Sequence, residues 1–509
     1  MSLYEGRDVT FTGLVWQYLS SIVGLLAALL YYIYIIRLFN TEIIGVFSLL
    51  SALLLLFSNI FSLGLGTGLQ HFISFNLGKH DEGKIRTMIK EFVLLGIVLS
   101  LSAFFSLWLL SPIFSKLFFH TYAFMGYLKL LDVELADGIF NGFIFSILAG
   151  LQKFKLSAEI SIINTVVAYG LVVPFLLLNF NPIMILLAWI TANYLTTSIL
   201  LLVSYRLFKG LPAGAAEKVD IRPFIIYSLP ILISSLIGYG STYVDRFIVS
   251  FFMNLSDLGI YNFSLLIISA FSILTSPIQV VLLSKLSELY GRGEMGNFRL
   301  YSTKAINILT AFYVPTAIIA AAISPSIILF LTGKQQYLQG VVPIVIILVV
   351  SSLAISRTIM ATGLRAVRVT KIFILTTSAG LIANFVLSAL LIPIYGIEGA
   401  AIGYSSTFMV SFPIIYYYAR KHNTFYFEKV KLLKIFVSSF TVFFLLLFIQ
   451  DKLGYSIVRL FVYIVVGLAV YLFLTRVLNV FSEEDLDIFL GLFPARLNGF
   501  KRFIRSLFV

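Results

Sequence analysis

Long apolar segments alternate with short polar segments along almost the whole chain. A helix needs about 20 mostly apolar residues to cross a bilayer, and the pattern predicts about fourteen such spans. The predicted spans are residues 14–36, 43–65, 88–111, 124–148, 156–179, 182–205, 223–252, 257–283, 304–331, 337–362, 370–394, 397–419, 431–449 and 455–477. Their continuous apolar runs lack the alternation of a transmembrane β-barrel, so only helices can satisfy the backbone in lipid.

The composition supports a chain that is solvated mainly by lipid. Of the 509 residues, 60% are hydrophobic and 12% are charged, whereas a soluble domain carries roughly 25% charged residues. A soluble fold of this length cannot bury such an apolar surplus. We therefore predict an all-α polytopic membrane protein.

The basic residues indicate how the chain is oriented. The formal net charge is +13, and most of the 36 Lys and Arg residues lie in predicted loops on one side of the membrane. Cytoplasmic loops are enriched in Lys and Arg, so we expect a multi-pass protein of the plasma membrane with both termini in the cytoplasm. This distribution explains the charge better than nucleic-acid binding does, and no nucleic-acid partner is predicted.

The sequence lacks the signals of several kinds of chemistry. It has no cysteine, and its four histidines show no metal-ligand spacing. Neither a phosphate-binding loop motif nor a nucleophile–base constellation is present. We predict no enzymatic activity, no cofactor and no metal site. The energy for transport is then expected from an ion gradient, the membrane potential or downhill consumption of the substrate.

A short repeat divides the chain into two halves. Residues 42–47 (EIIGVF) enter the second span, and residues 256–261 (SDLGIY) enter the eighth with the same pattern. Their spacing of six spans predicts two parallel six-helix lobes around a central cavity. The predicted parts are an N-terminal lobe 1–206, a linker 207–222, a C-terminal lobe 223–420, two additional helices 431–477 and a basic amphipathic cytoplasmic tail 478–509.

The fourth span carries four ionisable residues, which are costly inside a bilayer. Lys129 and Asp132 lie three residues apart and can pair on a helix, and Glu134 and Asp137 share a face and repel each other. The two carboxylates suggest a proton or cation site or a cavity lining. The alternative is that part of this segment lies at the outer membrane interface.

The seventh span has a wide polar face. Tyr239, Tyr243 and Arg246 follow one helical stripe, and Asp245 lies on an adjoining face. Arginine recognises phosphate bidentately and tyrosine rings pack on sugars, so this face is a candidate substrate site. The alternative is an intramolecular Asp–Arg clamp that holds the bundle together.

Other positions have weaker signals. Arg357 in the tenth span is a candidate phosphate ligand or a snorkelling side chain, and Arg37 is a candidate ligand or an interfacial anchor. Gly64, Gly66 and Gly68 end the second span, which favours close helix packing over a helix break.

An ordered set of motifs resembles the polysaccharide transporter, or lipid-linked oligosaccharide flippase, family of the multidrug/oligosaccharidyl-lipid/polysaccharide exporter superfamily. These motifs are Arg37-Leu38-Phe39 with Gly45-Val46-Phe47, Ser228-Leu229-Pro230, Asp245-Arg246 with Gly259-Ile260-Tyr261, and Asn384 before residues 392–403 (IPIYGIEGAAIG). The resemblance implies a V-shaped pair of lobes with a cationic cavity, and two extra helices bordering a groove for the lipid tail. The acids of the fourth span depart from the cationic pattern.

The resemblance and the intramembrane charges together lead to one functional hypothesis. The protein is predicted to flip a polyprenyl-phosphate- or pyrophosphate-linked oligosaccharide from the inner to the outer leaflet by alternating access. Substrate phosphate and sugar are assigned to Arg246, Arg357, Lys129, Tyr239, Tyr243 and Arg37. Coupling to a proton or sodium ion is assigned to Glu134, Asp137, Asp132 and Asp245.

Three alternatives remain open. A multidrug/cation antiporter of the same superfamily predicts twelve spans and an acid in the first span, which has none. A membrane glycan polymerase or ligase predicts a long external loop, which is lacking. The third is a non-transporting assembly scaffold. The expected partners are the lipid-linked substrate, membrane lipids and other glycan-assembly proteins, and the expected state is a monomer.

Overall fold

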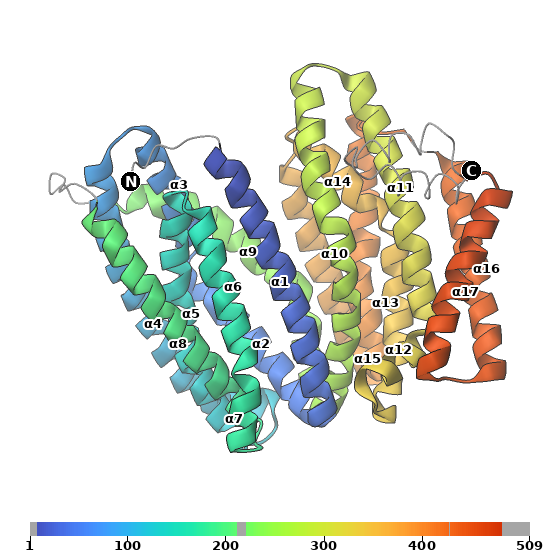
Figure 1. The fold of residues 1–509 in the computed structure, drawn as a ribbon, viewed down its shortest axis with the longest axis horizontal. Helices are drawn as coiled ribbons and strands as arrows, with labels where there is room; N and C mark the ends of the chain where they lie inside the picture. Colours follow the sequence, from blue (N-terminus) through green and yellow to red (C-terminus); the bar gives the residue numbers. More distant parts are fainter. Residues whose placement is uncertain (1–7, 211–219, 427, 481–509) are drawn as a thin grey trace. The chain divides into compact units, whose positions relative to one another are not determined.

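The computed structural model describes residues 8–210, 220–426 and 428–480, and these ranges are helical with short connections (Figure 1). They contain 17 α-helices, one 3-10 helix and no strand, which confirms the predicted all-α class. Two compact units are formed, Met1–Gly240 and Ser241–Val509, and the boundary between them falls within helix α9. Much of the predicted linker and nearly all of the predicted tail lie outside the described residues.

The helices follow the chain in order from α1 to α17. Those that begin in unit 1 are α1 (Asp8–Leu38), α2 (Thr41–Ser62), α3 (Leu65–Gly78), α4 (Glu82–Phe118), α5 (Met125–Gly150), α6 (Phe154–Gly170), α7 (Val172–Leu178), α8 (Ile183–Lys209) and α9 (Arg222–Phe252). Those of unit 2 are α10 (Leu255–Gly291), α11 (Met295–Ala322), α12 (Ser324–Thr332), η1 (Gln335–Gly340), α13 (Val341–Leu353), α14 (Ser356–Ala366), α15 (Lys371–Lys421), α16 (Lys429–Leu453) and α17 (Ile457–Val477).

Every predicted span is largely helical in the described chain, with short interruptions at Leu63 and Gly64, at Leu171, at Ile323 and at Ala354 and Ile355. Twelve helical segments are long and apolar enough to cross a membrane. This number counts α15 once, although α15 holds the predicted spans 370–394 and 397–419, and it leaves out α10 with its apolar segment Leu255–Phe271. Gly396 breaks α15 with a φ of 59° and a ψ of −136°, between these two spans. The apolar pattern therefore located the helices correctly.

The two copies of the repeat begin their helices with the same cap. Oδ1 of Asn40 accepts a hydrogen bond from the backbone N–H of Ile43 at 3.1 Å, and Oδ1 of Asn254 accepts one from Asp257 at 2.9 Å. Asparagine at this position satisfies an N–H that the helix itself leaves unpaired. The two copies of the repeat therefore share the structure of the helix start as well as the sequence pattern.

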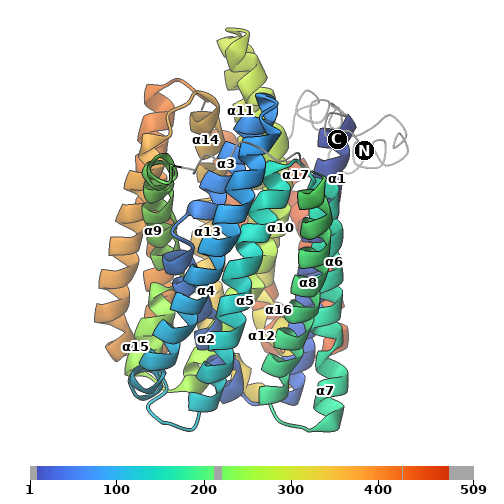
Figure 2. The same ribbon diagram turned by 90° about the vertical axis from the view of Figure 1, so that its left-hand side faces the viewer.

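Helix α5 lies in the middle of unit 1 and packs against α2, α3, α4 and α8 (Figure 2). The first glycine of the Gly64, Gly66 and Gly68 series separates α2 from α3, since Leu63 and Gly64 have φ values of 52° and 66°. Gly64 and Gly68 also lie close to Ser228, so that a Cβ at either would meet an oxygen of Ser228 within 2.8 Å. The glycines therefore provide both a helix break and close packing.

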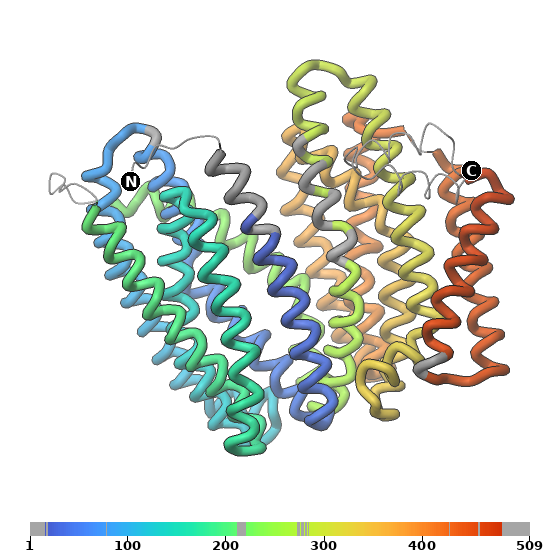
Figure 3. The backbone as a smooth tube through the Cα atoms, viewed as in Figure 1, coloured from blue at the N-terminus to red at the C-terminus, as the bar shows by residue number. Residues whose placement is uncertain are grey.

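Unit 2 is built around α11, which packs against α10, α13 and α16 (Figure 3). The last two helices are joined to it by a buried core that includes Ile319, Leu446 and Tyr463. Two polar contacts reinforce this packing: Gln450 Nε2 donates to the carbonyl of Ala322 at 2.9 Å, and the Tyr471 hydroxyl donates to that of Ala311 at 2.8 Å. Helices α16 and α17 are thus integral parts of unit 2.

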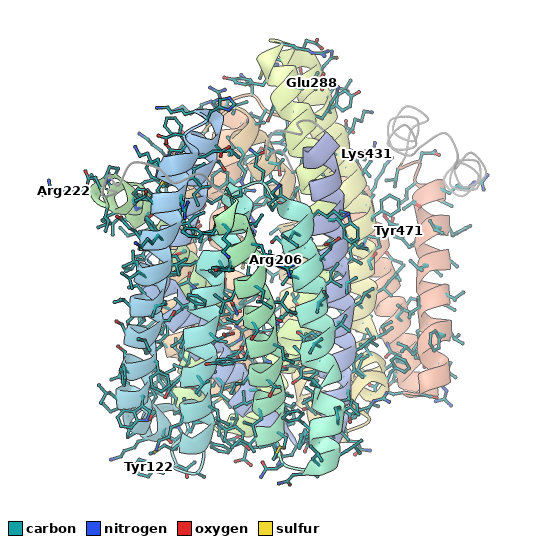
Figure 4. All side chains as sticks on the ribbon, turned by 60° about the vertical axis from the view of Figure 1, so that its left-hand side comes forward. Tyr122, Arg206, Arg222, Glu288, Lys431 and Tyr471 are labelled. Carbon is teal, nitrogen blue, oxygen red and sulfur yellow. The ribbon has the colours of Figure 1, made fainter. Side chains whose placement is uncertain are left out.

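Polar and charged side chains gather at the helix ends in each unit. Figure 4 labels Tyr122 at one end of unit 1, and Arg206 and Arg222 toward the opposite end. In unit 2, Glu288 near the end of α10 pairs with Lys285 at 3.1 Å and with Arg292 at 2.7 Å. These exposed positions frame the apolar stretches, as expected of helices that cross a membrane.

Candidate functional site

Unit 1 contains a network of carboxylate, amide and hydroxyl side chains between three membrane helices. We call it the acid–amide cluster, and it comprises Glu134, Asp137 and Asn141 of α5, Asn164 of α6, and Asn193, Thr196 and Thr197 of α8. Helix α5 packs against α8, and α6 packs against both. The predicted pair of acids on the fourth span therefore faces α8 and is hydrogen-bonded to it, and α6 joins the network through Asn164.

One arm of the acid–amide cluster ends at Glu134. Nδ2 of Asn193 donates a 2.5 Å hydrogen bond to Oε1 of Glu134. Asn164 then donates to Oδ1 of Asn193 at 2.6 Å and to the hydroxyl of Thr196 at 2.9 Å. Oε2 of Glu134 is buried and has no hydrogen-bond partner among the described residues. One oxygen of this carboxylate is therefore available for a proton or a cation.

The other arm ends at Asp137, whose two oxygens are both occupied. The hydroxyl of Thr197 donates to Oδ1 at 2.6 Å, and Nδ2 of Asn141 donates to Oδ2 at 2.8 Å. Two such donors stabilise an ionised carboxylate. Asp137 and Glu134 therefore differ in hydrogen bonding although they lie on the same helix.

Asp132 and Lys129 lie outside this network. Asp132 is completely buried, and neither of its oxygens has a hydrogen-bond partner in the described part of the chain. Lys129 lies in the first turns of α5 and is exposed. The pair that the sequence suggested is not hydrogen-bonded among the described side chains, and both oxygens of Asp132 lack a partner there, whereas Glu134 lacks one for Oε2 alone.

Unit 2 contains a second cluster, which we call the arginine–tyrosine cluster. Its members come from five helices: Tyr243, Asp245 and Arg246 of α9, Tyr261 of α10, Tyr313 of α11, Arg357 of α14, and Tyr404 and Ser411 of α15. Asp245 is completely buried and its Oδ2 accepts a hydrogen bond from the Tyr261 hydroxyl. That hydroxyl also lies 3.3 Å from the carbonyl oxygen of Ala400.

Arg246 is the least satisfied charge of the arginine–tyrosine cluster. Its guanidinium lies 4.1 Å from the centre of the Tyr243 ring, a cation–π distance. Nε and Nη1 are buried without a hydrogen-bond partner among the described residues, and so is Oδ1 of Asp245. Asp245 and Arg246 therefore do not satisfy each other's hydrogen bonds, as the two residues of a clamp would. Two N–H donors of Arg246 remain able to bind an acceptor.

Arg357 approaches the same region from α14. Its Nη1 donates to the hydroxyl of Ser411 at 3.0 Å, and its guanidinium lies 5.5 Å from the Phe408 ring. Tyr404 is within electrostatic range of both Arg246 and Arg357. Tyr404 thus lies in the electric field of both guanidinium groups and is partly buried.

Two predicted ligands are not members of either cluster as defined above. The Tyr239 hydroxyl donates to the backbone oxygen of Ala52 on α2 at 2.6 Å. Arg37 is exposed in the last turn of α1. The Tyr239 hydroxyl is therefore bound to the backbone of α2, although Tyr239 and Tyr243 lie four residues apart on the same helix.

The sequence interpretation missed the neutral members of the two clusters. Asn164, Asn193 and Thr197 lie inside the fifth and sixth predicted spans, where such polar side chains commonly form hydrogen bonds between helices. Tyr404 and Ser411 belong to the predicted span 397–419, whose charged residue is Glu398 near its start. Among the described residues there is no group of three or more His, Asp or Glu side chains that could hold a metal ion.

Comparison with known proteins places these features in a family. The model of a family described as polysaccharide biosynthesis protein matches residues 11–289. A search of curated proteins finds no match.

Several solved structures share the fold. The structure of the lipid II flippase MurJ in an inward closed conformation matches with a TM-score of 0.71 and 16% identity, covering 92% of this chain and 98% of that chain. An inward-facing multidrug resistance MATE family transporter of the MOP superfamily matches with a TM-score of 0.65 and 14% identity, covering 79% and 94%. A MOP superfamily transporter from Pyrococcus furiosus matches with a TM-score of 0.55 and 15% identity, covering 83% and 97%.

Proposed function

This chain belongs to the polysaccharide biosynthesis protein family, and we propose that it flips a polyprenyl-phosphate- or pyrophosphate-linked oligosaccharide across the membrane by alternating access. The fold is that of an integral membrane transporter. The substrate travels from the inner to the outer leaflet, with its phosphate at the arginine–tyrosine cluster and its polyprenyl chain in lipid.

The observation that carries this proposal is the state of Arg246. A guanidinium inside a membrane helix costs at least about 2.5–3.5 kcal/mol, and here two of its nitrogens lack acceptors among the described residues. A phosphate group supplies several acceptor oxygens in the planar arrangement that a guanidinium recognises. Tyr243 holds the guanidinium from one face and leaves its N–H edge free for such a ligand.

The test is transport by the purified protein in vesicles. A fluorescent polyprenyl-pyrophosphate-linked disaccharide is incorporated, and its arrival in the outer leaflet is followed by an impermeant quencher. Arg246→Ala should slow flipping at least tenfold, which corresponds to about 1.4 kcal/mol. Arg246→Lys should recover part of the rate, because it keeps the charge but loses the bidentate geometry.

Arg292→Ala is the matched control, because Arg292 is exposed and paired with Glu288 near the end of α10. It should leave flipping unchanged. Unimpaired flipping by Arg246→Ala would disprove the phosphate assignment. Equal losses in Arg246→Ala and Arg292→Ala would point to a general effect of charge instead.

A second candidate, a drug/cation antiporter, is favoured by the acid–amide cluster. The carboxylate of Glu134, whose buried Oε2 lacks a partner in the described chain, suits exchange of a cation or a proton. The candidates differ in substrate charge: the arginine–tyrosine cluster suits an anion, whereas a cationic drug needs an acid. Drug accumulation in an efflux-deficient host, with and without the protein, separates them.

A further inference from the structure

Unit 1 has a pocket that neither cluster uses. Its volume is about 310 Å³, and it lies between the end of α2, the start of α3 and the middle of α5. Pockets of about 300–1,000 Å³ hold small ligands, so this one is at the size of a single compact ligand. The pocket borders the face of α5 next to the one that carries Glu134 and Asp137, but neither of these residues lines it.

The lining of the pocket is polar and uncharged. Five hydroxyl or amide side chains contribute to it, and these are Ser58, Asn59, Ser62, Thr67 and Ser146. Apolar surface comes from Ile139 and Phe143, and no Asp, Glu, Lys, Arg or His is among the lining residues. An ion would find no opposite charge here, and an acyl chain would leave the hydroxyl and amide groups unsatisfied.

Several of these polar groups are free to bind a ligand. The hydroxyls of Ser58 and Thr67 have no hydrogen-bond partner among the described residues. Nδ2 of Asn59 donates to the carbonyl of Leu55 at 2.7 Å, and no bond of its Oδ1 to the described chain is seen. The hydroxyl of Ser146 donates to the carbonyl of Gly142 at 2.8 Å and can still accept. Donors and acceptors are thus mixed around the pocket.

Two glycines keep the pocket open. Gly138 and Gly142 lie in the interior of α5, and a Cβ built on either meets nothing within 4 Å. Glycine inside a helix is destabilising relative to alanine, and these two are not required by close packing. By contrast, a Cβ on Gly150 of the same helix would meet Ile73 at 2.8 Å. Space for a ligand is a physical reason for glycine at Gly138 and Gly142.

We propose that this pocket binds a neutral sugar ring of the transported glycan. A sugar ring presents hydroxyls that both donate and accept, together with an apolar C–H face, which matches the mixed lining. The inference deepens the proposed function and rests on it for the identity of the glycan. It assigns the sugar to unit 1, apart from the phosphate assigned to the arginine–tyrosine cluster.

Direct binding of free sugars tests the proposal on the full chain in nanodiscs. Saturation-transfer NMR is recorded with maltose and N,N′-diacetylchitobiose, and with glucuronate as an anionic comparison. Wild-type protein should give transfer to at least one neutral disaccharide and little to glucuronate. Absence of transfer to both neutral sugars, or equal transfer to glucuronate, overturns the proposal.

Variants locate the site. Gly142→Leu fills the pocket and should weaken sugar binding at least tenfold. Gly170→Leu is the control, because Gly170 ends α6 outside the pocket and a Cβ there also meets nothing within 4 Å. If Gly142→Leu fails to fold, the double variant Ser58→Ala with Thr67→Val removes the free hydroxyls without adding bulk. Undiminished sugar binding by a folded pocket variant overturns the assignment.

The flipping assay separates this proposal from the proposed function. In one outcome, the wild type binds sugar, Gly142→Leu does not, and the wild type flips no lipid-linked oligosaccharide. This result supports the sugar site in the pocket and contradicts the flippase function. Normal flipping by Gly142→Leu, together with no sugar binding by the wild type, supports the flippase and defeats the pocket.

Discussion

The Tyr261 hydroxyl donates a hydrogen bond to Oδ2 of Asp245, and both side chains are completely buried in unit 2. Tyr261 is the aromatic residue of the second repeat copy, and Phe47 stands at this place in the first copy. The ring of Phe47 lies 5.8 Å from that of Trp189 instead. The repeat therefore conserves the helix start and the aromatic ring, while the added hydroxyl gives unit 2 a buried polar contact.

Replacing Tyr261 with phenylalanine should destabilise the protein. The substitution keeps the ring and removes the hydroxyl that donates to Oδ2 of Asp245. An unsatisfied buried acceptor costs about 1–3 kcal/mol. Thermal unfolding in detergent should show a lower melting temperature for Tyr261→Phe. Adding Asp245→Asn should make this decrease smaller, because an unpaired neutral amide costs less to bury than an unpaired carboxylate.

Tyr313→Phe provides the comparison for Tyr261→Phe. Its hydroxyl lies 3.4 Å from the neutral hydroxyl of Ser351, and a weak bond to a neutral partner contributes less than one to a carboxylate. A loss in Tyr313→Phe as large as that in Tyr261→Phe would contradict the importance of the Asp245 contact.

Glu134→Gln should change the ion dependence of transport. The glutamine keeps an acceptor for Asn193 but cannot take up a proton or balance a cation. Flipping in vesicles should then lose its response to an imposed pH or sodium gradient while downhill movement persists. Glu159→Gln is the control, because Glu159 is part of an exposed pair with Lys155 at 3.8 Å. An undiminished gradient response would remove Glu134 from the coupling step.

The helices were predictable because bilayer thickness imposes a long apolar run on every span. The starts of α2 and α10 could be predicted as well, because each copy of the repeat begins two residues after a capping residue, Asn40 or Asn254. Helix ends inside a span were less visible. The break at Leu63 and Gly64 was an alternative that the glycine series left open, and the backbone conformation shows that it occurs.

The candidate site was predictable only on single helices. The sequence places Glu134 and Asp137 on one face, but the donors Asn193 and Thr197 come from α8, about sixty positions later. Helical periodicity fixes which residues of one helix share a face, whereas the rotation of a helix against its neighbour depends on packing across the whole unit. For the same reason, the stripe that Tyr239 and Tyr243 share on α9 could be predicted, but the bond of the Tyr239 hydroxyl to α2 could not.

Labelling of single cysteines should establish the orientation of the chain. The protein has no cysteine, so one introduced residue is the only target. Tyr122 follows α4 and Arg292 follows α10, and both are exposed. By the positive-inside rule, an impermeant maleimide should label Tyr122→Cys in intact cells and Arg292→Cys only after permeabilisation. The opposite pattern would show inverted termini, and labelling of both in intact cells would contradict the predicted spans between them.

Gly64→Ala should destabilise unit 1 more than an alanine substitution at a glycine whose Cβ would meet no atom within 4 Å. Gly64 has a φ of 66°, which is in the left-handed region. A residue with a Cβ costs about 1–2 kcal/mol in this backbone conformation. The new Cβ would also lie 2.8 Å from the Ser228 carbonyl oxygen and 3.2 Å from the Leu232 nitrogen, and neither backbone atom can move without shifting α9.

Gly170→Ala is the matched control for Gly64→Ala, because a Cβ at Gly170 meets nothing within 4 Å and this residue ends the helix α6. Alanine there should be neutral or slightly stabilising, since it restricts the unfolded chain. Thermal unfolding of both variants in one detergent separates the effects. Equal melting temperatures would mean that α9 can shift away from the new Cβ at Ser228. The Ser228-Leu229-Pro230 motif would then not hold α9 closely against the start of α3.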